Sequence, residues 1–140
     1  MKLGKLVVVP VALVGLVGAA CSGDGGSDAD VVVTMRDDAI TLSNDAPAAG
    51  DLSFEGVNEG TLTHEFEVFG VPEGVDANDL PLDGDTARAD EMLEVIDEVE
   101  DIAPGTSAEL SLNLQPGDYA VLCNLPGHYA NGMHATFTVA

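Results

Sequence analysis

Short apolar runs, some alternating with polar residues and separated by turn-forming residues, predict a chain made mainly of strands. The clearest run is Ser107–Leu114, where every second residue is Ala or Leu, which is the period of a half-buried strand. Tyr119–Cys123 is apolar on both faces, which is typical of a central strand between two packed layers. Further strands are expected at residues 31–35, 39–42, 52–57, 63–69 and 133–139.

Residues 72–102 interrupt this pattern with an acidic insertion. The stretch Asp76–Asp90 contains Pro81 and Gly84 among its acids, so we expect an exposed loop there. A short helix is expected near Thr86–Leu93, followed by a strand that ends before Ala103. The acids of that strand are typical of a sheet edge that is protected against edge-to-edge association.

The first twenty residues have the pattern of an export signal. Lys2 and Lys5 precede an apolar run over residues 6–20, and small residues lead into Cys21. The run is shorter than the roughly 20 residues of a membrane-spanning helix. We therefore expect residues 1–20 to be a signal peptide and Cys21 to be lipidated. Gly18 departs from the lipoprotein pattern, which usually has Leu there, so an ordinary cleaved signal is the alternative.

Residues 21–30 contain no apolar side chain larger than Ala apart from the cysteine, so we expect a flexible linker behind the lipid-bearing Cys21. Residues 31–140 then form one domain, which we expect to be a monomer. This arrangement predicts an exported protein that is anchored through the lipid to the outer face of the cytoplasmic membrane.

The chain has 25 acidic and 4 basic residues, and its formal net charge is −21. Beyond the predicted signal peptide, Arg36 and Arg88 are the only basic residues apart from the histidines. Such a charge repels nucleic acid and excludes a nucleic-acid-binding function. Two interpretations of the acidic surface stay open: solubility in a salty or mildly acidic medium, and steering of a basic partner protein.

Three residues with metal-binding side chains follow one another at intervals of five, Cys123, His128 and Met133. A thiolate, an imidazole and a thioether form a soft ligand set, which selects copper over calcium or magnesium. Two His and one Cys with a weak axial Met define a blue-copper centre, so one further His is needed. Cys123 is explained as a copper ligand and Cys21 as the lipidation site, so we predict no disulfide between them.

Strand parity separates the two remaining histidines, His64 and His134. His64 shares a strand face with Phe66 and Val68, so it is expected to point inward, whereas Glu65 is expected at the surface. In the last strand Met133 is expected to point inward and His134 outward. The predicted ligands of one copper ion are therefore His64, Cys123, His128 and Met133.

From about Val31 to Ala140 the chain resembles the cupredoxins, the family of plastocyanin and azurin. The resemblance is carried by His64, Tyr119-Ala-Val-Leu-Cys123, Pro126-Gly127-His128 and Gly132-Met133, which match the order of the family's motifs. It implies a Greek-key β-sandwich and a copper ion that alternates between Cu(I) and Cu(II). One position departs from the family pattern, since Glu65 stands where many members have Asn beside the copper thiolate.

The expected function is single-electron transfer outside the cytoplasmic membrane, to or from a cytochrome or a membrane oxidoreductase. The partner is expected to dock a basic surface on this acidic chain. The alternative is a copper storage or delivery protein that uses the same ligands. An enzyme with an open copper position is a third hypothesis, but no nucleophile–base pair is evident, so we expect no catalytic activity.

Overall fold

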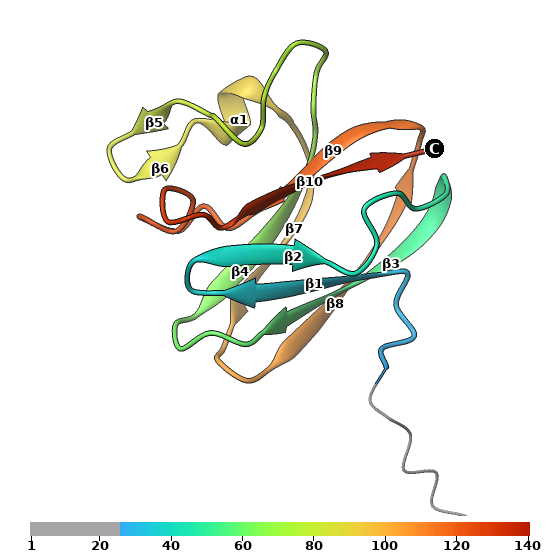
Figure 1. The fold of residues 1–140 in the computed structure, drawn as a ribbon, viewed down its shortest axis with the longest axis horizontal. Helices are drawn as coiled ribbons and strands as arrows, with labels where there is room; N and C mark the ends of the chain where they lie inside the picture. The colour runs from blue at the N-terminus through green and yellow to red at the C-terminus, as the bar shows by residue number, and fades with distance from the viewer. Residues whose placement is uncertain (1–25) are drawn as a thin grey trace, which may run out of the picture.

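The computed structural model describes residues 26–140, which fold into two packed four-stranded sheets (Figure 1). Sheet A has the strand order β2-β1-β3-β8, and sheet B has the order β10-β9-β4-β7. The strands of sheet A are β1 (Val31–Arg36), β2 (Ala39–Leu42), β3 (Gly50–Asn58) and β8 (Ser107–Leu114). Those of sheet B are β4 (His64–Gly70), β7 (Glu94–Ile102), β9 (Gly117–Leu122) and β10 (His134–Val139). Only β1 and β3 pair in parallel among these strands.

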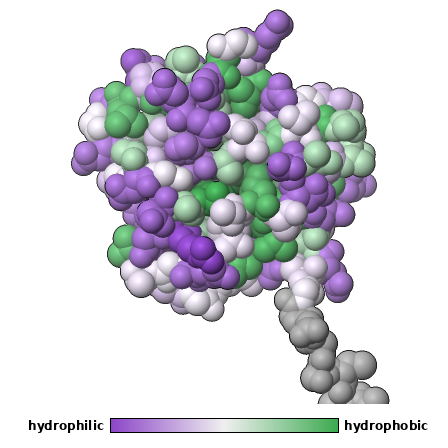
Figure 2. All heavy atoms as spheres, viewed as in Figure 1, coloured by the Kyte–Doolittle hydropathy of each residue, from purple (hydrophilic) through white to green (hydrophobic). Residues whose placement is uncertain are grey.

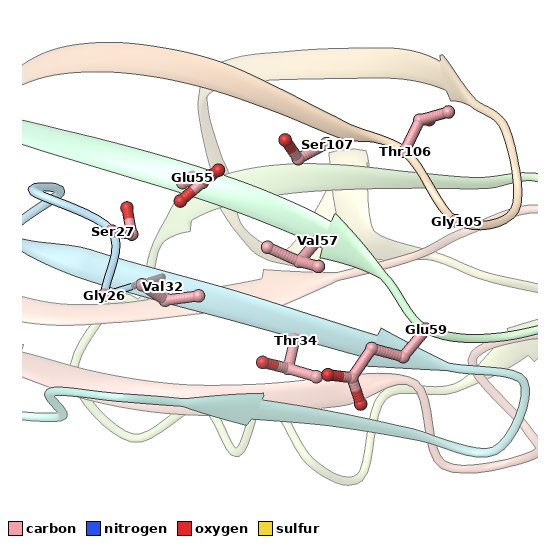
Figure 3. Close-up of a pocket in the computed structure, with 10 residues that line it drawn as sticks. All are labelled: Gly26, Ser27, Val32, Thr34, Glu55, Val57, Glu59, Gly105, Thr106 and Ser107. Carbon is pink, nitrogen blue, oxygen red and sulfur yellow. The ribbon is translucent and has the colours of Figure 1, made fainter. Parts of the chain in front are cut away.

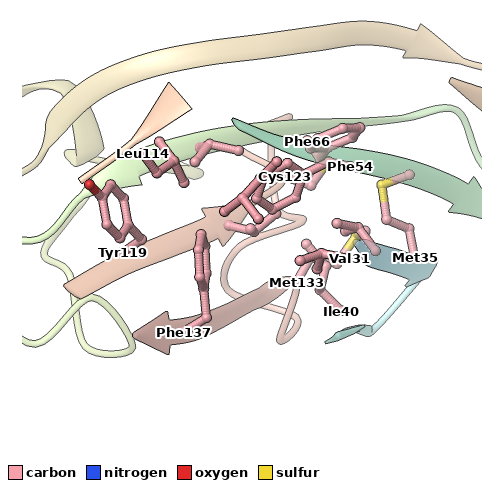
Figure 4. Packing of buried hydrophobic residues seen from close by; sticks show 14 of the residues in the cluster. Val31, Met35, Ile40, Phe54, Phe66, Leu114, Tyr119, Cys123, Met133 and Phe137 are labelled. Atoms are coloured by element: carbon pink, nitrogen blue, oxygen red, sulfur yellow. The ribbon is translucent and has the colours of Figure 1, made fainter. Parts of the chain in front are cut away.

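The main hydrophobic core lies between the two sheets, where the inward residues of each strand meet. Phe54 from sheet A and Phe137 from sheet B pack with their ring centroids 5.8 Å apart. Figure 4 shows Cys123 and Met133 inside this same buried cluster, and both side chains are fully buried. These two ligand candidates are therefore held in place by the close-packed core.

A second, smaller core covers the opposite face of sheet B. It is formed where residues 71–93, here called the insertion, pack against the outward side chains of β4 and β9 and against the loop before β10. The insertion contains the two-stranded ladder β5 (Leu82–Asp83) with β6 (Thr86–Ala87) and the single-turn helix α1 (Ala89–Met92). The buried residues of this second core are Phe69, Ala77, Leu80, Ala87, Ala89, Leu93, Ala120, Leu122 and Tyr129.

The predicted all-β sandwich is confirmed, and each strand expected outside residues 72–102 is present within two residues of its expected ends. β7 is an edge strand and carries the predicted acids. Two details of the insertion are wrong. The helix is shorter than expected, because Thr86 and Ala87 pair with Leu82 and Asp83 as a ladder, and the loop is not fully exposed, because Leu80 and Ala77 fill the second core.

Residues 1–25 lie outside the described part of the chain, so the signal peptide and the lipidation of Cys21 stay predictions. Between residues 26 and 140 no helix has the length and apolar character needed to cross a bilayer. Hydrophilic residues cover most of the molecular face drawn in Figure 2, with scattered apolar patches between them.

Candidate metal centre

Three of the four predicted ligands converge at one end of the sandwich. The potential ligand atoms of His64, Cys123 and His128 all lie within 4.8 Å of one another. The Nδ1 atoms of the two histidines are 3.1 Å apart, and the Cys123 Sγ lies 3.4 Å from the His128 Nδ1. His64 and Cys123 are fully buried, whereas solvent reaches part of His128. Strand β4 and the segment after β9 thus bring together residues that are 59 positions apart.

The loop from Cys123 to Met133, here called the ligand loop, is closed by its own backbone. The Cys123 N–H donates to the Met133 carbonyl at 3.1 Å, and the Met133 N–H donates to the His128 carbonyl at 3.1 Å. These two bonds place the fully buried Met133 beside both other loop candidates. Gly132 makes this course possible, because its φ is +112° and an added Cβ would lie 2.5 Å from the Asp38 carbonyl oxygen.

Asp37, in the turn between β1 and β2, holds the outer nitrogen of His64. Its Oδ1 lies 3.0 Å from the His64 Nε2. The same carboxylate accepts hydrogen bonds from the hydroxyl and the N–H of Thr61 and from the Leu62 N–H. These contacts, led by the Thr61 hydroxyl, lower the pKa of Asp37 to about 2. An ionised carboxylate only accepts, so the His64 Nε2 donates to Asp37, and Nδ1 is the ring nitrogen that faces His128.

Burial shifts the pKa values of the His128 imidazole and the Cys123 thiol. Burial, together with the neighbouring His64, lowers the pKa of His128, which favours the neutral imidazole that binds metals. Burial raises the pKa of the Cys123 thiol in the metal-free chain. Hydrogen bonds from the backbone of Glu65 and Leu125 act in the opposite direction and support the thiolate that a metal ligand requires.

The prediction that Glu65 lies at the surface is wrong, since its residue is only 7% exposed. Parity did place Glu65 on the outer face of β4, but the insertion and the ligand loop cover that face. The Glu65 carboxyl accepts a bond from the Asn124 backbone and shares a hydrogen bond with Glu67. Burial first, and then the Glu65 charge, raise the pKa of Glu67 to about 8, and Glu98 stands directly opposite on β7.

His134 takes no part in the cluster, as parity predicted, but it is half-buried rather than surface-exposed. Its Nδ1 lies 2.9 Å from the Asn78 Oδ1, and its ring packs on Tyr129 with centroids 4.7 Å apart. The reason is again the insertion, which contributes Asn78 and encloses this face of β10.

The insertion is fastened to the ligand loop by side chains that sequence reasoning did not single out. The Asn124 amide accepts from the Ala87 N–H at 2.8 Å and donates to the Ala87 carbonyl at 2.9 Å. The Tyr129 hydroxyl donates to the Ala77 carbonyl and accepts from the Leu80 N–H, both at 2.9 Å. Two residues that directly follow candidate ligands, Asn124 and Tyr129, therefore brace the loop from outside.

The donor set fits copper. It combines one thiol sulfur with two imidazole Nδ1 atoms around the same small volume, and a buried thioether lies in the same loop. Thiolate and thioether sulfur select copper, and His2Cys with a weak Met is the ligand set of blue-copper centres. Calcium and magnesium are unsuited, because they require oxygen ligands.

A hollow elsewhere on the domain is unrelated to this centre. It lies on the outer face of sheet A, and Figure 3 shows its lining residues. These are Gly26, Ser27, Val32, Thr34, Glu55, Val57, Glu59, Gly105, Thr106 and Ser107. None of the predicted ligands is among them.

Comparison with known proteins agrees with the fold and the donor set. Residues 65–140, more than half of the chain, match the copper-binding proteins of the plastocyanin/azurin family. That segment begins one residue after His64 and includes the whole ligand loop. No curated protein sequence matches the chain.

Solved structures of similar fold include the reduced auracyanin of the photosynthetic bacterium Roseiflexus castenholzii, with 21% identity and a TM-score of 0.56 over 82% of this chain and 99% of that one. Auracyanin B has 20% identity and a TM-score of 0.51, with 82% and 92% covered. Rusticyanin of Thiobacillus ferrooxidans has 17% identity and a TM-score of 0.53, with 79% and 75% covered. At these identities the likeness concerns the fold.

Proposed function

Because the chain belongs to the plastocyanin/azurin family of copper-binding proteins, we propose that it is a blue-copper electron carrier with His64, Cys123, His128 and Met133 as the ligands of one copper ion. The observation that carries this proposal is the convergence of two imidazole nitrogens and a thiol at a buried point. Copper held there supplies a one-electron couple, Cu(I)/Cu(II). One electron enters from a reduced partner and leaves to an oxidised one.

The protein's own contribution is a site that is set before the metal arrives. His64 is held through its outer nitrogen by Asp37, and the ligand loop is closed at both ends by backbone hydrogen bonds. Ligands fixed by a rigid framework need not rearrange when the charge of a bound metal changes. His128, the partly exposed member of the cluster, is the proposed entry and exit point for electrons.

The decisive experiment is the visible and paramagnetic-resonance spectrum of the chain loaded with Cu(II). We expect an intense visible absorption from thiolate-to-copper charge transfer, which Cys123→Ser abolishes. His134→Gln is the matched control, because His134 lies outside the cluster and its loss should leave the absorption unchanged. A colourless copper-loaded protein would contradict the proposal.

Storage or delivery of copper is the competing function, and metal exchange distinguishes it. An electron carrier retains its copper through repeated reduction and oxidation, because His64, Cys123 and Met133 are fully buried and a partner cannot reach them directly. The loaded protein is cycled with a one-electron reductant and oxidant in the presence of a copper-binding acceptor. Rapid transfer of the metal to the acceptor would favour the delivery function.

We further propose that the protein works outside the cytoplasmic membrane, anchored through a lipid on Cys21, and exchanges electrons with a cytochrome or membrane oxidoreductase of basic surface. The N-terminal signal pattern and the excess of acids support this proposal. Mass spectrometry of the mature N-terminus after expression of the full chain tests the anchor. A lipid adduct on Cys21 is expected, and a cleaved, unmodified N-terminus would contradict it.

A further inference from the structure

The turn between β1 and β2 approaches the proposed copper site from two sides. Asp37 reaches the outer nitrogen of His64 at 3.0 Å, and the Asp38 carbonyl lies against Gly132, next to Met133. The turn thus contacts both His64 and the ligand loop. Neither contact has a signature in the sequence, because the partners are 27 and 94 positions apart.

The Asp37 carboxylate is held in place from several directions. It accepts from the Thr61 N–H at 2.9 and 3.1 Å, from the Thr61 hydroxyl at 2.6 Å and from the Leu62 N–H at 3.2 Å. A Cβ at Gly60 would lie 2.2 Å from the Asp37 Oδ1 and 2.8 Å from the His64 Nε2. Only glycine at position 60 lets the backbone pass this close to the Asp37–His64 pair.

No basic side chain within residues 26–140 neutralises this carboxylate. Arg36, its neighbour in sequence, pairs with Glu59 at 2.8 Å, and Arg88 pairs with Glu91 in the insertion. The only ion-pair partner of Asp37 in this part of the chain is His64 itself. The negative charge is therefore directed at a ligand.

We propose that Asp37 is a positioning residue of the copper site, which fixes the orientation and tautomer of His64 and stabilises Cu(II) relative to Cu(I). This inference rests on the proposed function. A carboxylate bonded to the outer nitrogen of a ligating imidazole makes that ligand more basic. Its charge also favours the more positive of two metal charges. Both effects lower the reduction potential.

The test compares Asp37→Asn with Asp38→Asn in the copper-loaded full chain. Asn keeps the acceptor oxygen and the shape of Asp37 while removing the charge, and Asp38→Asn removes the same charge from the exposed neighbour in the same turn. We expect Asp37→Asn to weaken Cu(II) binding relative to Cu(I) by about tenfold, which raises the potential by about 59 mV for one electron. Asp38→Asn should change this ratio by less than about twofold, because its side chain does not touch a ligand and is screened by water.

A second readout needs no copper. In the metal-free protein, nitrogen NMR of His64 should show the proton on Nε2, and Asp37→Ala should remove that preference, whereas Asp38→Ala should retain it. Equal potentials in Asp37→Asn and Asp38→Asn, or an unchanged His64 tautomer in Asp37→Ala, would overturn the inference while leaving a blue wild-type protein intact. A wild-type chain that binds no copper would overturn the proposed function as well.

Discussion

The brace between the insertion and the ligand loop can be tested by deleting one oxygen atom. Tyr129→Phe keeps the ring in the second core but removes a hydroxyl that makes two buried hydrogen bonds, to Ala77 and Leu80. Each buried group left unpaired costs roughly 1–3 kcal/mol. Two such groups are left, so we expect the free energy of unfolding to fall by about 2–6 kcal/mol, which corresponds to a decrease of roughly 8–25 °C in Tm for a domain of this size.

Tyr119→Phe is the matched control for this change. The Tyr119 hydroxyl also makes an internal hydrogen bond, to the Gln115 carbonyl at 2.8 Å, but that bond is only partly buried and lies at the β8–β9 turn. Water can replace the lost donor, so we expect a cost of about 1 kcal/mol. Denaturant unfolding of both copper-free variants measures the difference.

The copper-loaded variants separate bracing from simple stability. Tyr129 follows His128, so loss of its anchor should loosen the ligand loop, and copper should pass to an excess of chelator several-fold faster than in Tyr119→Phe. If the two variants lose equal stability and release copper at equal rates, the insertion does not brace the ligand loop, and the reasoning is refuted.

Three further predictions concern the site and its surroundings. Met133→Leu keeps the buried volume but removes the thioether, so the copper spectrum should change. The free energy of unfolding of the copper-free protein should change by less than about 1.5 kcal/mol. An unchanged spectrum would exclude Met133 as a ligand. Gly132→Ala should destabilise the copper-free domain by at least about 1 kcal/mol in denaturant unfolding, because φ is +112° and the new Cβ meets the Asp38 carbonyl, and unaltered stability would show that the turn yields freely. Glu67 holds its proton in the folded domain up to about pH 8 but loses it near 4.5 when unfolded, so stability falls as pH rises through that window. Glu67→Gln should flatten this dependence between pH 5 and pH 8, whereas Glu109→Gln on exposed β8 should not, and equal pH profiles would contradict the assignment.

Sequence patterns predicted the sandwich and the inward direction of His64, because residues that alternate along a strand report which face is buried. The same pattern failed for Glu65, because alternation cannot reveal that the outer face of β4 is covered too. That cover comes from the insertion. Its buried residues include small ones such as Ala77, Ala87 and Ala89, which lie among many acids, so the sequence of the insertion resembles an exposed loop.

The partners of the ligands were less predictable than the ligands. Asp37 reaches His64 across 27 positions, and only the pairing of β1 with β3 and the course of residues 58–64 bring them together. Asn124 and Tyr129 sit beside recognisable motif residues, but their bonds lead to backbone groups of the insertion, which have no side-chain signature. A contact made through backbone atoms leaves no trace in residue identity.

The acidic edge strand β7 makes the stability of this fold depend on the ionic strength around it. Carboxylates follow one another along β7 from Glu94 to Asp101, and those on one face of a strand are about 7 Å apart. The screening length of water is about 10 Å at 0.1 M salt and about 3 Å at 1 M. Repulsion between these carboxylates is therefore significant in dilute buffer and almost fully screened at about 1 M salt. The free energy of unfolding of the domain should accordingly increase as the salt concentration rises.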